Sequence, residues 1–215
     1  MRYVALLRGI NVGGKNLIRM TDLKASFESH GFEDVSTYIQ SGNVLFQAPR
    51  ESSRALTLRI ETLLTATFGT AATVVVRSHS QLRSVVESAP RGFGGRPRQY
   101  RYDVVFLKEP VTASAAVATI RTKPEVDQVW VGRGVLYFAR LEARATQSRL
   151  NSIVASPIYP SITIRNWNTT TKLLALMDAA AADASKREGS GHRMRGKRVG
   201  EGRADATPRR TKGSP

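Results

Sequence analysis

Hydrophobic and polar positions follow two different periods along the first part of the chain. Short apolar runs predict buried strands, and apolar residues three or four positions apart predict amphipathic helices. Up to residue 78 these patterns follow one another as strand, helix, strand, strand, helix, strand. The predicted strands are 3–7, 35–39, 44–46 and 73–76, and the predicted helices are 21–30 and 56–68. This order is the split βαββαβ arrangement of a ferredoxin-like unit.

The same order of elements recurs after a short linking helix predicted at 80–88. No repeat is visible at the level of single residues, so the recurrence is one of element order only. The predicted strands are 102–107, 126–131, 135–139 and 161–165, and the predicted helices are 112–121, 148–155 and 169–183. We therefore predict an α+β fold of two ferredoxin-like halves with antiparallel sheets, 1–78 and 79–183, and a C-terminal helix.

The segment 184–215 has a different composition. It consists mainly of Ser, Gly, Lys, Arg, Pro and Thr, and it carries ten of the 33 Lys and Arg residues of the chain. Because such a segment buries too little apolar surface to offset the entropy of ordering, we predict a disordered basic tail. The net charge of +16 favours polyanions, phosphates or acidic partners. An arginine-biased composition with an ordinary solvated surface would give the same charge.

Composition also excludes several kinds of site. The chain has no cysteine, which excludes disulfides, thiolate catalysis and zinc–sulfur centres. Its three histidines stand at no metal-ligand spacing, so we expect no metal and no cofactor. No apolar run reaches the roughly 18–20 residues of a membrane helix, and we expect a cytoplasmic protein with no membrane contact. The sequence does not indicate an oligomeric state.

A glycine-rich loop, Gly9 to Asn16, follows the first predicted strand. Its backbone N–H groups can point at an anion, and it matches the G-x-x-x-x-G-K spacing of phosphate-binding loops. Two features argue against a nucleotide hydrolase. Asn16 stands where Ser or Thr would hold magnesium, and the helix begins several residues late. A non-catalytic cradle for a phosphate or carboxylate and a plain glycine turn both stay open.

Strand direction is expected to bring a second segment to this loop. In a βαββαβ unit the first two strands run the same way, so the turn after the second strand should lie beside the loop after the first. The alternative is that Asn and Ser side chains only cap one another and the turn. The candidate ligand-binding residues are Arg8, Asn11, Gly13, Gly14, Lys15, Asn16, Tyr38, Ser41, Gly42 and Asn43.

The start of the last helix is a second candidate anion site. Hydroxyl groups and a helix N-terminus lie there beside basic side chains. The residues are Arg165, Asn168, Thr169 and Lys172, with Asn168 as the expected N-cap. The alternative is an ordinary capped helix anchored by Trp167.

The loop from Arg91 to Arg98 is basic and rich in glycine. Its first four residues match the opening of an RNA-recognition signature, but Gly95, Arg96 and Pro97 cannot continue as a central strand. The loop is therefore interpreted as an Arg/Gly segment that contacts phosphates or as a plain linker.

Three segments together resemble one bacterial family. They are YVALLRGINVGGKN at 3–16, TYIQSGNV at 37–44, and RNWNT with KL at 165–169 and 172–173. The family is that of domain of unknown function 1697, and the resemblance covers residues 1 to about 177. It implies a small cytoplasmic bacterial protein with two ferredoxin-like halves, and it implies no established activity, substrate or catalytic residue. One departure is Arg149, where the family pattern leads us to expect lysine, and the two are not equivalent at a site that uses a point charge.

From the sequence we favour a non-catalytic binding module for a phosphate-bearing ligand, with nucleic acid first because of the charge. A small-molecule enzyme is one alternative, with an anionic substrate at the Gly-rich loop and Lys15 as an electrostatic group. A protein-interaction or structural module is the other.

Overall fold

The computed structural model describes residues 1–11 and 17–195, with the backbone alone described for 185–195. The chain divides into two compact units, Met1–Asp178 and Ala179–Pro215. Four of the candidate ligand-binding residues lie outside the described residues, and so does the tail beyond residue 195. Those four are Gly13, Gly14, Lys15 and Asn16.

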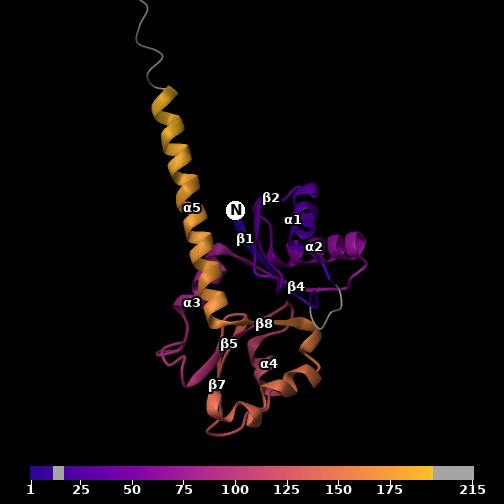
Figure 1. Cartoon of the computed structure of the whole chain (residues 1–215), viewed down its shortest axis with the longest axis vertical. Helices are drawn as coiled ribbons and strands as arrows, with labels where there is room; N and C mark the ends of the chain where they lie inside the picture. The colour runs from indigo at the N-terminus through magenta and orange to yellow at the C-terminus, as the bar shows by residue number, and fades with distance from the viewer. Residues whose placement is uncertain (12–16, 196–215) are drawn as a thin grey trace, which may run out of the picture. The chain divides into compact units, whose positions relative to one another are not determined.

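The first part of the chain forms a four-stranded antiparallel sheet with two helices (Figure 1). Its neighbours in space follow the order β2-β3-β1-β4, so β1 lies in the interior of the sheet. The elements are β1 (Arg2–Arg8), α1 (Met20–Ser29), β2 (Glu33–Tyr38), β3 (Asn43–Gln47), α2 (Ser53–Phe68) and β4 (Thr73–Ser78).

The second part repeats this sheet order as β6-β7-β5-β8, again with antiparallel neighbours. Helix α3 (His79–Glu87) precedes it, and Ser78 and Gln81 form a capping box at the start of this helix. The remaining elements are β5 (Tyr100–Leu107), α4 (Ala113–Thr119), β6 (Asp127–Gly132), β7 (Val135–Leu141), the 3-10 helices η1 (Glu142–Gln147), η2 (Leu150–Ala155) and η3 (Tyr159–Ser161), β8 (Ile162–Asn166) and α5 (Trp167–Arg195).

Two sequence predictions for the second part need correction. The helix predicted at 148–155 is the short 3-10 helix η2, in a segment where the Ser152 and Ser156 hydroxyls donate to backbone carbonyls three residues earlier. Helix α5 begins at Trp167 and continues to Arg195, so residues 184–195, predicted to be disordered, are helical. Composition argued against a packed core there, but Ala, Lys and Arg are themselves good helix formers.

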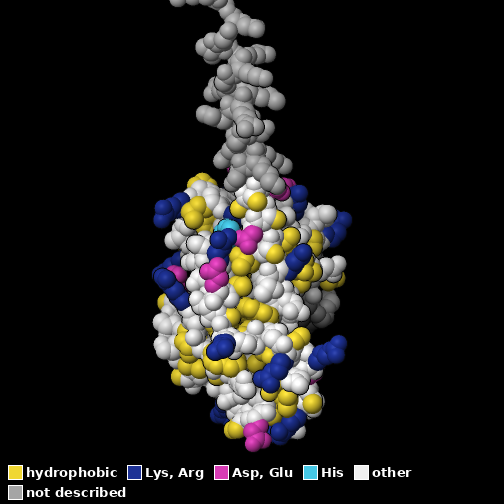
Figure 2. All heavy atoms as spheres, turned by 90° about the vertical axis from the view of Figure 1, so that its left-hand side faces the viewer, with side chains coloured by type: hydrophobic (Ala, Val, Ile, Leu, Met, Phe, Trp, Pro, Cys, Tyr) yellow, Lys and Arg dark blue, Asp and Glu magenta, His cyan; other side chains and the backbone are white. Residues whose placement is uncertain are grey.

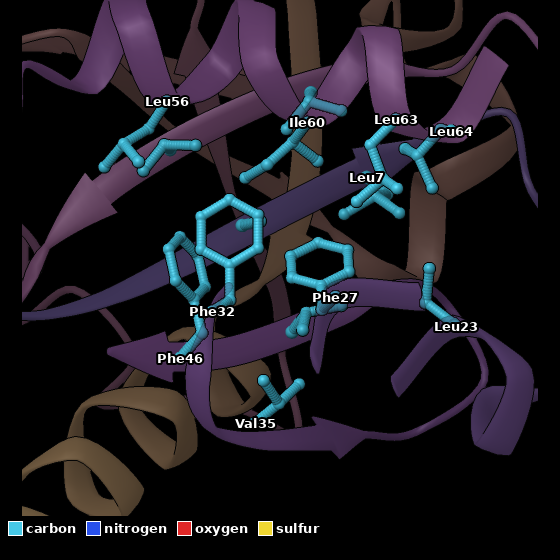
Figure 3. Close-up of a cluster of buried hydrophobic side chains, with 14 of the residues drawn as sticks. Leu7, Leu23, Phe27, Phe32, Val35, Phe46, Leu56, Ile60, Leu63 and Leu64 are labelled. Atoms are coloured by element: carbon cyan, nitrogen blue, oxygen red, sulfur yellow. The ribbon is translucent and has the colours of Figure 1, made fainter. Parts of the chain in front are cut away.

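Three hydrophobic clusters hold Met1–Asp178 together. The first lies between α1, α2 and one face of the first sheet, where the rings of Phe32 and Phe46 are 4.8 Å apart. Figure 3 shows these rings with Phe27, facing the α2 side chains Leu56 and Ile60. The third cluster is its counterpart behind the second sheet. Each helical layer therefore covers only one face of its sheet.

The other face of each sheet is buried in the second cluster. Val4 and Leu6 of β1 share this cluster with Val104 and Phe106 of β5, and residues of α3 and α5 complete it. Because successive residues of a strand point to opposite faces, burial on both faces explains why residues 3–7 form an unbroken apolar run. Where they pack against one another, these sheet faces are consequently not free to act as a platform for bases, as they do in standard RNA-recognition domains.

Candidate functional site

The loop after β1 and the turn after β2 lie side by side. The Leu7 backbone N–H donates to the Gly42 carbonyl at 2.8 Å. The Asn11 side chain donates to the carbonyls of Gln40 (3.1 Å) and Ile18 (3.0 Å), and its oxygen accepts from the Ile18 N–H at 2.8 Å. Asn11 thus ties both ends of the loop to the turn, as the common direction of β1 and β2 led us to expect.

The turn itself is held by its own side chains. Asn43 is fully buried, and its amide donates to the Tyr38 carbonyl (3.0 Å) and to the Ser41 hydroxyl (3.2 Å). Gly42 has a φ of +78°, and a Cβ there would come within 2.9 Å of side-chain atoms of Leu7 and Ile10. Asn43 and Ser41 therefore cap one another and the turn, as the alternative interpretation expected. Gly42 allows the close approach of Leu7 and Ile10.

Arg165 of β8 enters this turn from the second half of the chain. It is 7% exposed, and its Nε donates to the Asn43 side-chain oxygen. Its Nη2 donates to the carbonyls of Leu7 (2.6 Å), Gly42 (3.1 Å) and Ser41 (3.2 Å). Its Nη1 donates within β8, to the Thr163 hydroxyl (2.8 Å) and the Ile164 carbonyl (2.9 Å).

All of these acceptors are neutral. Burial lowers the pKa of Arg165 to about 10, so the guanidinium still carries its positive charge at neutral pH. No carboxylate pairs with it among the residues that the structure describes. A buried charge that is solvated only by dipoles projects a positive potential into its surroundings.

Arg8, the last residue of β1, supplies a second positive charge. Its guanidinium lies over the Tyr159 ring, 4.0 Å from the centroid, and its Nη2 donates to the Thr73 hydroxyl at 2.7 Å. The Thr73 hydroxyl donates in turn to the Pro160 carbonyl at 3.1 Å. The Nε of Arg8 is buried and has no hydrogen-bond partner in the described part of the chain. The side chain is thus held on two sides without a counter-ion.

A hollow of about 460 Å³ lies between these groups, and we call it the β1–β8 hollow. This volume is in the range of small-ligand sites. None of its described lining residues is acidic. They are Leu7, Arg8, Gly9, Ile10, Asn11, Gln40, Ser41, Tyr159, Thr163, Ile164 and Arg165.

The two sites predicted from the sequence are therefore rearranged. Arg165 leaves the second site and joins the first. The other three residues of the second site, Asn168, Thr169 and Lys172, do not line the hollow. Nor is Asn168 the N-cap: its own N–H donates to the Asn166 side chain at 2.9 Å.

Tyr38 also lies outside the lining and packs against the cluster between the sheets. Of the polar lining residues, sequence reasoning missed Gln40, Tyr159 and Thr163. Thr163 could have been found, because it is two residues from Arg165 in a strand and so shares its face.

The described residues were also compared with the requirements of a metal site and of a membrane-spanning helix. No group of three His, Asp or Glu side chains is placed to hold a metal ion. None of the described helices is long and apolar enough to cross a membrane.

The chain belongs to a family of unknown function, because the sequence profile "Protein of unknown function (DUF1697)" matches residues 1–137. This confirms the resemblance found in the motifs. The match includes the loop and the turn of the β1–β8 hollow and ends before β8, which provides Arg165.

The chain is also similar to the structure of the conserved bacterial protein SP0830 from Streptococcus pneumoniae, with a TM-score of 0.71 and 26% identity. The similarity covers 81% of this chain and 97% of that one. No curated protein matches the chain.

Proposed function

We propose that the chain is a non-catalytic binding module and that the β1–β8 hollow holds a small phosphate-bearing ligand. The observation that supports this most directly is the meeting of Arg8 and Arg165 in a hollow whose described lining contains no acidic residue. An anion entering the hollow meets two positive charges that are already held in place, so little entropy is lost in ordering them.

The two arginines would contribute in different ways. The N–H groups of Arg165 are engaged with protein acceptors, so this residue attracts the ligand through its charge. Arg8 is held through Nη2 and through the face of its guanidinium, which leaves Nη1 to donate to a phosphate oxygen. Gly13, Gly14, Lys15 and Asn16 remain part of the proposed site on sequence grounds alone.

Calorimetric titration with inorganic phosphate, pyrophosphate and ribose 5-phosphate tests this proposal. We expect at least one of them to bind and Arg8→Gln to weaken binding tenfold or more, since a charge-assisted hydrogen bond contributes about 1.5–3 kcal/mol. Arg121→Gln is the matched control, because Arg121 is exposed and lies outside the lining. The proposal fails if none of the three binds or if both variants behave alike.

Nucleic acid remains a second candidate ligand because the net charge is +16. Burial of the packed parts of both sheet faces argues against the standard stacking platform, so we expect surface arginines to make most of the contacts with phosphates. In that case we expect the affinity for a single-stranded oligonucleotide to fall steeply between about 50 and 200 mM salt, as it does for proteins that contact several phosphates. An affinity that does not change with salt would exclude this candidate.

We also infer that each half is a ferredoxin-like unit. Two observations support this: the βαββαβ order of the first half, and the sheet order that both halves share. In the second half η2 takes the place of the second helix.

A further inference from the structure

The basic loop between α3 and β5 packs on the second sheet instead of running free. The Phe93 ring lies 4.8 Å from Tyr102, 5.4 Å from Tyr137, 5.1 Å from Trp167 and 5.9 Å from Trp130, measured between ring centroids. The loop backbone is closed by hydrogen bonds from Phe93 N–H to the Pro90 carbonyl (2.9 Å) and from Gly95 N–H to the Gly92 carbonyl (3.0 Å). It is therefore an ordered lid over one end of this sheet face.

Gly94 shows how closely this loop approaches the sheet. Its φ is +81°, and a Cβ at this position would overlap the Trp167 ring. Only glycine fits there without displacing the tryptophan. The loop conformation, and with it the direction of the neighbouring arginines, is thus coupled to the aromatic cluster.

Beneath this loop, β5 and β6 present aromatic side chains on one face of the sheet, and β7 presents a small residue between them. Tyr100 and Tyr102 share one face of β5, with ring centroids 6.1 Å apart. In the strand register the small Ala139 stands between Tyr102 and Gln128, and Trp130 is the next residue of β6 on this face. A hollow of about 330 Å³ lies between the loop and these side chains of β5 and β6, and we call it the Trp130 hollow.

Arginines stand at the rim of the Trp130 hollow. Arg91 and Arg96 are exposed, and the Arg96 guanidinium lies 5.2 Å from the centroid of the Tyr100 ring. No described lining residue is acidic. The lining consists of Pro90, Arg91, Gly92, Phe93, Gly95, Arg96, Tyr100, Tyr102, Gln128 and Trp130.

We propose that the Trp130 hollow binds a nucleotide, with the base stacked on the Trp130 ring and the phosphate held by Arg91 and Arg96. Aromatic rings beside arginines are the combination that binds single-stranded nucleic acids and nucleotides, because every base offers a π-face and every nucleotide a negative charge. The Gln128 amide can both donate to and accept from a base edge.

This site goes beyond the proposed function of the β1–β8 hollow and shares no residue with it. A free nucleotide and one residue of a single strand offer the same chemistry. Figure 2 shows the face of the molecule toward which the loop projects, where Lys and Arg side chains alternate with hydrophobic ones in its lower part. Such a surface suits either source.

Tryptophan fluorescence provides a direct test, because the chain has two tryptophans and one of them lines the hollow. The full chain is titrated with adenosine monophosphate, ribose 5-phosphate and a ten-residue deoxythymidine oligonucleotide. We expect the monophosphate and the oligonucleotide to quench the fluorescence, and the ribose phosphate, which has no base, to leave it unchanged even if it binds the β1–β8 hollow. Stronger binding of the oligonucleotide, per site, would identify single-stranded nucleic acid as the source, and equal binding would identify a free nucleotide.

Variants then locate the site. Arg91→Gln with Arg96→Gln should weaken quenching tenfold or more, whereas Arg98→Gln with Arg121→Gln, which removes the same charge from exposed positions outside the lining, should change it less than twofold. Trp130→Phe should remove most of the quenching. The inference is overturned if no base-containing ligand quenches, if the two double variants behave alike, or if quenching survives in Trp130→Phe.

Discussion

Arg77 of β4 and Arg165 of β8 make the same interaction in opposite directions between the two halves. Arg77 donates from Nη2 to the carbonyls of Leu107 (2.7 Å) and Gly134 (2.9 Å). Arg165 donates from Nη2 to those of Leu7 (2.6 Å) and Gly42 (3.1 Å). Each arginine thus reaches the end of the partner half's first strand and the turn of its hairpin.

The strand registers are consistent with this equivalence. Arg77 stands opposite Val4 in the first sheet, and Arg165 stands opposite Val104 in the second. The two halves therefore share a residue-level pattern as well as an order of elements. The sequence did not reveal this pattern, because few residue types outside the arginine, the leucine and the turn glycine are the same.

Replacing either arginine by methionine should destabilise the chain by about 3–5 kcal/mol. Each change leaves buried carbonyl groups with fewer donors and removes a link between the halves. Urea unfolding followed by circular dichroism measures the loss, with Arg121→Met as the control, for which we expect a change within 0.5 kcal/mol. Equal stability of Arg165→Met and the control would contradict the role given to this residue.

How much of the site could be predicted depends on the range of its contacts. The pairing of Asn11 with the turn at Ser41 followed from strand direction, which strong apolar runs make predictable. The insertion of Arg165 did not, because an arginine in a short strand carries no information about a partner more than a hundred residues away. Tyr159 was missed for a similar reason: it lies in a 3-10 helix that has no apolar period.

At the position equivalent to Arg8, the second half has a charge that is paired. Lys108 follows Leu107 as Arg8 follows Leu7, but both carboxylate oxygens of Glu61 lie 2.7 Å from its Nζ. Glu61→Gln should lower the free energy of unfolding by about 1 kcal/mol, since the pair is only partly buried and its geometry is good. A double-mutant cycle with Lys108→Met measures the coupling. A coupling energy of zero would show that the pair does not stabilise the fold.

The contact between α3 and Asp178 of α5 should depend on pH. The hydrogen bond from His79 and the contact with Arg83, each at 2.6 Å, hold the pKa of Asp178 below its ordinary value. Because the folded-state pKa is lowered, the stabilisation is present above the unfolded pKa of about 4 and is lost as pH falls through the folded value.

Asp178→Asn should therefore reduce stability more at pH 7 than near pH 3, where the pH is below the unfolded pKa. The carboxylate is about half exposed, so we expect a small difference, within about 1 kcal/mol. Urea unfolding of both proteins at the two pH values checks this. The same difference at both pH values would show that ionisation of Asp178 is not its cause.

Tyr159 provides a test of the β1–β8 hollow that leaves the net charge unchanged. Its ring supports the Arg8 guanidinium, and such a contact contributes about 0.5–2 kcal/mol. If Arg8 must be held in place to bind a phosphate, Tyr159→Leu weakens phosphate binding about three- to tenfold in a calorimetric titration. In the Arg8→Gln background the same change should have no further effect, because the ring then has no cation to support. If the losses from Tyr159→Leu and Arg8→Gln simply add, the tyrosine acts independently of the arginine and the proposed arrangement is wrong.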